Sequence, residues 1–341
     1  MAIDKIDVTG DPRIERRTAQ INGKTYGYLL GQPKTGQYRA TVFLIHGFPD
    51  LSIGWRYQIP TLINLGLRVV APDCLGYGRT DAPEFTPENA PLYSHKRCAD
   101  DIKELALSLG ASKIILGGHD WGAALVYRIA LWHPDLVSHV FTVCVPFVPP
   151  TRQYQSLEDL VRTRAPHFAY QLQFKSGELE KAIRTKDEIR QFLVALYGGK
   201  THDGELGFDA RKGVLLDKMM RLRPSRLLGK EELDYYAEEF ARNGIHGPLN
   251  WYRTREINYK DELEILDRRI TVPVLFIQAL RDPALPPHLG KGMSKVIPKL
   301  TVEQVDTSHW ALWEKPDEVN SIIVRWLEKV ALVDGQLSSK L

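Results

Sequence analysis

The sequence predicts an α/β protein with a mostly parallel central sheet flanked by helices. Short apolar and β-branched runs alternate with segments of helical periodicity, which is the pattern of repeated βαβ units. The alternation is interrupted once, by residues 149–259, which are rich in charged and aromatic residues and contain no convincing core strand. We therefore expect one sheet with an inserted helical cap.

The elements are predicted in the following order. Two alternating runs around Asn22-Gly23 indicate a β-hairpin. Six core strands follow, at TVFLIH, LRVVAPD, KIILGG, VFTVCV, PVLFIQA and LTVEQV, with helices expected at Cys98–Leu109, Gly122–Trp132 and Ser321–Val330. This pattern divides the chain into a first part of the core (1–148), the cap (149–259), and a second part of the core with a C-terminal tail (260–341).

The bulk composition is that of an ordinary globular protein. Of the 341 residues, 43% are hydrophobic and 26% are charged, which argues against disorder. The net charge is only +3, and Lys and Arg are interspersed with Asp and Glu, so we expect no nucleic-acid partner. The longest apolar stretch, HVFTVCVPFVPP, is too short to span a membrane.

The cysteines and the two ends of the sequence indicate the cellular compartment of the protein. Cys74, Cys98 and Cys144 have irregular spacing, typical of neither a disulfide framework nor a zinc site, so we expect a reducing compartment. We also expect no bound metal and no cofactor. The N-terminal MAIDKIDVTG lacks the apolar segment of a secretory signal. The C-terminal Ser339-Lys340-Leu341 matches a peroxisomal address, which predicts an import receptor as a partner and a peroxisomal or cytoplasmic location.

The stretch GGHDWG, residues 117–122, has the form of a nucleophile elbow with an unusual nucleophile. An apolar strand precedes it, an Ala-rich helix follows, and Gly118 and Gly122 stand where the sharp turn requires small residues. The position that serine usually holds is occupied by Asp120. An aspartate before a helix is most often an N-cap, but a cap does not require the flanking glycines, so we interpret Asp120 as a nucleophile.

A carboxylate nucleophile restricts the chemistry. Serine attacking a saturated carbon would leave an inert ether, whereas a carboxylate leaves an alkyl ester that water can hydrolyse. The reference pKa of aspartate, about 3.9, also keeps Asp120 ionised at neutral pH without a base to activate it. The sequence therefore predicts displacement at a saturated carbon.

Hydrolysis of such an ester needs a base for water, and two residues follow Asp120 in the expected order. Asp282 comes directly after the strand PVLFIQA, and His309 comes after LTVEQV, the places that acid and histidine take in this architecture. We expect His309 to take a proton from water and Asp282 to hold the imidazole and stabilise the imidazolium. Either residue alone would be an ordinary loop residue, but their joint placement supports a triad.

The loop after the first core strand supplies the remaining part of the site. The strand TVFLI runs into HGFPD, the position of a loop whose backbone N–H joins that of the residue after the nucleophile. We assign the oxyanion donors as the amides of Phe48 and Trp121. His46 and His119 are interpreted as hydrogen-bonded structural residues, and Phe48-Pro49 is a candidate cis peptide.

Taken together, HGFPD, VVAPDCLGYGRTD, GGHDWG, the late Asp282 and TSHWALWEKP resemble the soluble epoxide hydrolases of the α/β-hydrolase fold. The resemblance covers Thr41 to Leu327 and implies a helical cap over the active site. In that family two cap tyrosines hold the epoxide oxygen. FAYQLQF resembles the first motif and places it at Tyr170, and LNWYR resembles the second and places it at Tyr252.

A phenol of pKa near 10 can donate a proton to an opening epoxide while it stays neutral. Aromatic residues in helices are more often packing than catalysis, so each tyrosine alone is a weak assignment. Tyr154, Tyr197 and Tyr235 are the alternative candidates for the two cap tyrosines if the cap motifs of the family match other positions of this chain. Four aromatic side chains are expected to contact an apolar substrate, namely Phe48, Trp121, Trp251 and Trp310. For Trp55, Trp251 and Trp310 the sequence leaves two readings open, pocket wall or core packing.

The sequence leaves a dehalogenase as the nearest alternative, because that class uses the same Asp, His and acid on a carbon–halogen bond. Halide needs N–H donors but no proton, and Trp121 could supply one indole. The usual partner after the His-Gly step in dehalogenases is Asn, whereas this chain has Phe48. Phe48 and the paired tyrosines favour the epoxide.

Other classes are disfavoured by single features. A serine esterase would need a GxSxG motif, which the chain lacks. An NAD-dependent enzyme would need a third glycine, which the run from Gly76 to Asp81 lacks. A non-catalytic binding protein of this fold need not keep Asp120, Asp282 and His309 together.

Overall fold

The computed structural model describes residues 3–332. The predicted peroxisomal address Ser339-Lys340-Leu341 lies outside the described residues and stays a prediction. None of the helices within residues 3–332 is long and apolar enough to cross a membrane.

A single eight-stranded sheet forms the centre of the molecule, in the order β1-β2-β4-β3-β5-β6-β9-β10. The first three strands in this order pair antiparallel and the others are parallel. The predicted hairpin and the six predicted core strands are confirmed: β1 (Ile14–Ile21), β2 (Lys24–Gly31), β3 (Ala40–Ile45), β4 (Leu67–Pro72), β5 (Ile114–His119), β6 (Val137–Val143), β9 (Val274–Ala279) and β10 (Leu300–Val305).

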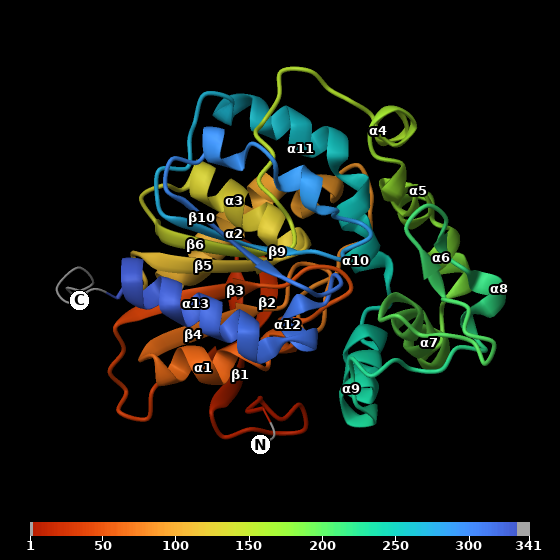
Figure 1. Ribbon diagram of the computed structural model, residues 1–341, viewed down its shortest axis with the longest axis horizontal. Coiled ribbons are helices and arrows are strands. Elements are labelled where there is room, and N and C mark those ends of the chain that lie inside the picture. The colour runs from red at the N-terminus through yellow and green to blue at the C-terminus, as the bar shows by residue number, and fades with distance from the viewer. Residues whose placement is uncertain (1–2, 333–341) are drawn as a thin grey trace.

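Helices cover both faces of the sheet, as predicted (Figure 1). On one face lie α1 (Gln58–Asn64) and α13 (Pro316–Val330), and on the other lie α2 (His95–Ser108) and α3 (Trp121–Trp132). The three predicted helices exist but begin earlier than expected. In α2 the start is fixed by Ser94, whose side chain accepts a hydrogen bond from the N–H of Arg97, and in α13 by Pro316 at the first turn.

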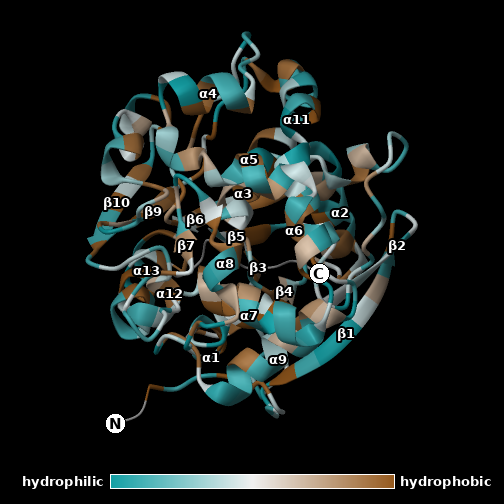
Figure 2. Ribbon diagram, turned by 90° about the vertical axis from the view of Figure 1, so that its right-hand side faces the viewer, coloured by the Kyte–Doolittle hydropathy of each residue, from teal (hydrophilic) through white to brown (hydrophobic). Residues whose placement is uncertain are grey.

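The chain between β6 and β9 is helical and adds nothing to the main sheet, in agreement with the interrupted alternation of the sequence. The limits 149–259 of the cap stay a prediction. The elements are α4 (Leu157–Thr163), η3 (Pro166–Phe168), α5 (Tyr170–Ser176), α6 (Glu178–Ala182), α7 (Lys186–Leu196), β7 (Phe208–Asp209), β8 (Gly213–Val214), α8 (Leu216–Met219), α9 (Lys230–Ala241), α10 (His246–Asn250), η4 (Trp251–Arg253), α11 (Arg255–Glu262) and η5 (Leu263–Ile265). Helices α5 to α10 lie at the carboxyl-end side of the sheet, on the right of Figure 1, whereas α11 lies at the top, beside α2 and α3; Figure 2 views the molecule from the side of α5 to α10.

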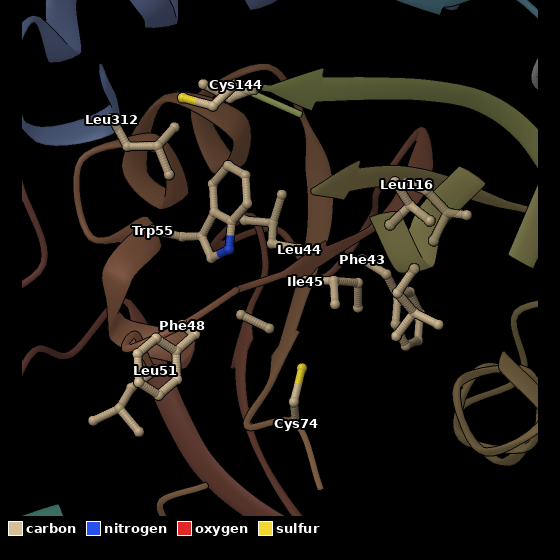
Figure 3. Packing of buried hydrophobic residues seen from close by; sticks show 14 of the residues in the cluster. Phe43, Leu44, Ile45, Phe48, Leu51, Trp55, Cys74, Leu116, Cys144 and Leu312 are labelled. Carbon is tan, nitrogen blue, oxygen red and sulfur yellow. The ribbon is translucent and has the colours of Figure 1, made fainter. Parts of the chain in front are cut away.

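Short helices occupy the loops at the ends of the core strands: η1 (Ser52–Trp55), η2 (Ala90–Tyr93), η6 (Pro287–Gly290), η7 (Met293–Lys295) and α12 (Ala311–Glu314). Figure 3 shows the buried side chains around β3, where Leu44 of the strand and Trp55 of η1 belong to one apolar cluster. Trp55 is completely buried, which places it in the core. Burial of this cluster is the main stabilising contribution to the fold.

Polar contacts attach α9 to the core. Three residues on one face of the helix, Glu232, Tyr236 and Glu239, meet partners from the core. Glu232 accepts a hydrogen bond of 2.8 Å from the buried Arg56, and Tyr236 donates one of 2.6 Å to Asp50. Glu239 pairs with Arg79 at 3.3 Å. These three contacts therefore fix the position of α9 relative to the core.

Candidate active site

The elbow between β5 and α3 has the backbone strain expected of a nucleophile. Asp120 has φ 51° and ψ −126°, which L side chains rarely adopt. A Cβ on Gly118 would lie 2.6 Å from the carbonyl oxygen of Gly122, and one on Gly122 would lie 2.0 Å from that of Ile45. Both glycines are therefore required by close backbone packing, as the sequence predicts.

The structure brings the three predicted triad residues together. The Nδ1–H of His309 donates a 2.6 Å hydrogen bond to Asp282, and Nε2 lies 3.6 Å from the carboxylate of Asp120. Asp282 is 3% exposed, and its second oxygen accepts hydrogen bonds of 2.9 and 3.0 Å from the N–H groups of Ala284 and Leu285. The imidazole is thus aligned between a structural carboxylate and the candidate nucleophile.

The ionisable groups of His309, Asp282 and Asp120 shift one another's pKa values. Burial lowers the pKa of His309, but the charges of Asp282 and Asp120 and the hydrogen bond to Asp282 outweigh it and raise the pKa to about 9. Burial raises the pKa of Asp282, but the imidazolium and the hydrogen bonds outweigh it and lower the pKa. For Asp120, burial dominates and raises the pKa, although His309 opposes it. These shifts favour a protonated His309 paired with an ionised Asp282.

The predicted oxyanion donors meet the candidate nucleophile. The N–H of Phe48 donates a 2.7 Å hydrogen bond to Oδ1 of Asp120, and the N–H groups of Phe48 and Trp121 both lower the pKa of the Asp120 carboxyl. In an ester of Asp120, that oxygen becomes the carbonyl oxygen on which negative charge develops. The Phe48-Pro49 peptide is cis, as anticipated.

His46 and His119 are buried and hydrogen-bonded, as interpreted from the sequence. His46 accepts at Nε2 from the N–H of Cys74, and burial lowers its pKa to about 4. His119 donates from Nε2 to the carbonyl oxygen of His309 at 2.9 Å, and the thiol of Cys144 donates to the same oxygen at 3.2 Å. His119, Cys144 and His309 each have one possible metal-ligand atom within 4.8 Å of the other two. The hydrogen bonds of His119 and Cys144, however, go to the backbone carbonyl oxygen of His309, so we interpret these two side chains as holding the backbone of His309 in place.

A cavity of about 320 Å³ opens beside Asp120 and His309. Its walls are mostly apolar side chains of the core and the helices between β6 and β9, with a few polar groups, as is usual for small-molecule sites. The lining includes Phe48, Pro49, Asp120, Tyr170, Phe174, Leu196, Leu206, Phe208, Leu227, Tyr252, Arg281, Asp282, Ser308, His309 and Trp310.

Both predicted cap tyrosines line this cavity together with Asp120. Their ring centroids lie 6.2 Å apart, and Phe174 packs edge-on against each of them at 5.1 Å. Burial is the largest cause that raises the pKa of Tyr170 and of Tyr252, and the charge of Asp120 adds to it. Both phenols are therefore neutral donors at ordinary pH.

The aromatic residues expected to contact substrate divide into two groups. Phe48 and Trp310 line the cavity, whereas Trp121 and Trp251 are absent from its described lining. The ring of Trp121 packs edge-on against Tyr252 at 5.2 Å, and the indole N–H of Trp251 donates to the carbonyl of Leu75 at 2.9 Å. A substrate contact of these two indoles stays a prediction that the cavity does not support.

The three alternative tyrosines, Tyr154, Tyr197 and Tyr235, are absent from the described lining of the cavity. Tyr197 donates its hydroxyl hydrogen bond to the carbonyl of Pro49, Tyr235 packs against Arg16, and Tyr154 is 44% exposed. Sequence reasoning missed two polar residues of the lining, Arg281 and Ser308. Their position beside Asp282 and His309 in the sequence was the signal that could have found them.

The fold and the arrangement of Asp120, Asp282 and His309 are those of an α/β-hydrolase. The family model described as "alpha/beta hydrolase fold" matches residues 40–316. Among curated relatives, epoxide hydrolase srdG of Neurospora crassa is 41% identical, and the match covers 94% of this chain and 97% of that protein. Bifunctional epoxide hydrolase 2 of Rattus norvegicus is 34% identical over 94% of this chain, which spans only 58% of the rat protein.

Solved structures lead to the same group. An epoxide hydrolase from Vigna radiata superimposes with a TM-score of 0.78 at 25% identity, covering 94% of this chain and 99% of that one. Epoxide hydrolase A from Mycobacterium thermoresistibile gives a TM-score of 0.75 at 29% identity, with 93% and 99% covered. The chain belongs to the epoxide hydrolases of the α/β-hydrolase fold.

The charge coupling at the site can be measured directly. Because the negative charge of Asp120 helps to raise the pKa of His309 to about 9, Asp120→Asn is expected to lower that pKa, so that more imidazole is neutral at pH 7. NMR titration of the imidazole checks this result. Asp234→Asn, a change of the same charge on the cap surface, serves as the control, and an equal pKa in all three proteins would contradict the coupling.

Proposed function

We propose that the protein hydrolyses an apolar epoxide to a vicinal diol. One observation carries the proposal: the carboxyl group of Asp120 shares an apolar cavity with the phenols of Tyr170 and Tyr252, and Nε2 of His309 lies 3.6 Å from it. This arrangement supplies a nucleophile for carbon on one side and acids for oxygen on the other. Membership of the epoxide hydrolases supports the same reaction.

The first step opens the ring. A carboxylate oxygen of Asp120 attacks one ring carbon, and the bond between that carbon and the epoxide oxygen breaks. The released oxygen takes a proton from the phenols of Tyr170 and Tyr252, which leaves an alkyl ester on Asp120 and one tyrosinate. Proton donation matters because an alkoxide is a poor leaving group.

The second step restores the enzyme. Esterification removes the charge of Asp120, which lowers the pKa of His309 and lets the imidazolium return a proton to the tyrosinate. Neutral His309 then takes a proton from water as the hydroxide adds to the ester carbonyl, whose oxygen faces the N–H of Phe48. The ester bond breaks, and the carboxyl proton of Asp120 passes to the leaving alkoxide, which completes the diol.

The alternative of a dehalogenase is less well supported by the lining of the cavity. A halide leaving group needs N–H donors from side chains, yet the position after His46-Gly47 is Phe48. The indole of Trp121 packs on the ring of Tyr252 and is absent from the described lining. The two phenols, in contrast, have no task in halide release.

Trapping the ester tests the proposal. His309→Gln protein mixed with styrene oxide is expected to accumulate an adduct of one substrate mass, because ring opening proceeds while water is no longer activated. Mass spectrometry of the digested protein should place the adduct on the peptide that contains Asp120. The same variant with Asp120→Asn is the control and should remain unlabelled.

Two other outcomes are decisive in this experiment. Labelling by a haloalkane and not by the epoxide would establish the dehalogenase reaction instead. Absence of labelling by either reagent, in protein whose fold is intact by circular dichroism, would refute catalysis through Asp120.

Removal of one phenol should affect ring opening specifically. Tyr252→Phe is expected to slow formation of the ester about a hundredfold, by analogy with the loss of one oxyanion donor, while the KM changes much less. Rapid-mixing kinetics under single-turnover conditions measures this rate. Tyr154→Phe removes an exposed hydroxyl and should leave it unchanged, and an unaltered rate in Tyr252→Phe would take Tyr252 out of the mechanism.

A further inference from the structure

The two candidate acid tyrosines stand on different elements, so their relative placement has to be maintained across an interface. Tyr170 is the first residue of α5, and Tyr252 lies in η4. In the sequence they are separated by most of the inserted region. A shared epoxide oxygen can reach both phenols only if α5 and η4 keep their positions relative to each other to within a fraction of an ångström.

Apolar packing between these elements does not set that position by itself. The rings of Tyr170, Phe174 and Tyr252 contact one another edge-on, with centroids 5.1 to 6.2 Å apart. Such pairs favour the edge-to-face arrangement, but they are spread over the ring surfaces and define the register of two backbones less sharply than a hydrogen bond does. A directional interaction is needed to fix the register of α5 against η4.

Arg253, the neighbour of Tyr252, provides that interaction. Its Nε donates a 3.1 Å hydrogen bond to the carbonyl oxygen of Lys175 in the last turn of α5. Its Nη1 donates at 2.6 Å to Oδ1 of Asn250 in α10, and its Nη2 forms an ion pair with Glu180 in α6. One planar guanidinium therefore bonds to α5, α6 and α10 at once.

The surroundings make this contact strong. The side chain of Arg253 is 15% exposed and that of Glu180 is 22% exposed, so the pair is less screened than the ion pairs on the surface of the cap. The ring of Phe85 lies 5.8 Å from the guanidinium. The bond to Lys175 is made to the main chain, so it fixes the helix α5 itself and not only one of its side chains.

We propose that Arg253 is a positioning residue for ring opening: it holds α5 and η4 in the register at which Tyr170 and Tyr252 both reach the epoxide oxygen. This inference rests on the proposed epoxide hydrolysis and deepens it. Arg253 does not line the cavity in the described part of the chain, so it acts through the two tyrosines. A lysine at this place keeps the charge but lacks the planar fork, so it bonds to only part of the set.

The test compares the two chemical steps in single turnovers with styrene oxide. Arg253→Lys is expected to slow ester formation at least about tenfold, because misplacement by about 1 Å can cost a hundredfold, and to leave ester hydrolysis by His309 within about twofold. Glu180→Gln removes one partner of the guanidinium and should give a smaller loss in the same step. Arg190→Lys, which alters the Arg190–Asp234 pair between α7 and α9, is the matched control and should change neither step.

A double variant separates positioning from loosening of the fold. If Arg253 acts only through the tyrosine pair, Arg253→Lys adds little once Tyr252→Phe has removed one member, and the combined loss stays near the hundredfold of Tyr252→Phe. Three results would each overturn the inference. The losses of the two single variants could multiply in the double variant, Arg253→Lys could slow ester formation and ester hydrolysis equally, or Arg253→Lys could form the ester as fast as the control Arg190→Lys.

Measurements on the unchanged protein distinguish failure of the positioning role from failure of the proposed function. If the unchanged protein opens no epoxide, the proposed function fails and the positioning role fails with it. If the unchanged protein is active and Arg253→Lys behaves like Arg190→Lys, only the positioning role fails. Thermal unfolding of each variant is recorded so that all rates are compared below its melting temperature.

Discussion

The geometry of the site depends on the strained turn at Asp120. Its positive φ of 51° lifts the carboxylate out of the sheet, and this turn can exist only because Gly118, Gly122 and Gly47 carry no side chain. A Cβ on any of the three would lie within 2.6 Å of a neighbouring atom, and for Gly47 that atom is the Cβ of Asp120. The rest of the site is arranged around this fixed carboxylate.

The charge of that carboxylate links the two halves of the proposed reaction. While Asp120 is ionised, it helps to keep His309 protonated; once Asp120 is esterified, the same imidazole loses part of this stabilisation and becomes a base. Asp282 keeps its partnership with His309 throughout. A single change of charge at the nucleophile thus switches the histidine from a resting ion-pair partner to the base that the second step requires.

The predicted strands are confirmed because a local signal, alternating hydrophobicity, carries them. The glycine-flanked elbow and the chain order point to Asp120, Asp282 and His309, whose side chains the structure brings together; their catalytic roles stay a prediction. The sequence predicts contacts between distant segments poorly. The wall of the cavity omits Trp251, whose indole bonds to the main chain, and the contact of Arg253 with α5 joins residues 78 positions apart. Neither periodicity nor motif spacing encodes such a contact, because it arises only when the inserted helices pack.

The most direct test of the central claim, attack by Asp120 on carbon, is a single turnover in ¹⁸O-water with the enzyme in excess. If Asp120 attacks carbon and water then attacks the ester carbonyl, the first diol formed contains no ¹⁸O, and the label appears in the peptide that holds Asp120. If water attacks the epoxide directly, the first diol carries ¹⁸O and Asp120 remains unlabelled, which would contradict the account.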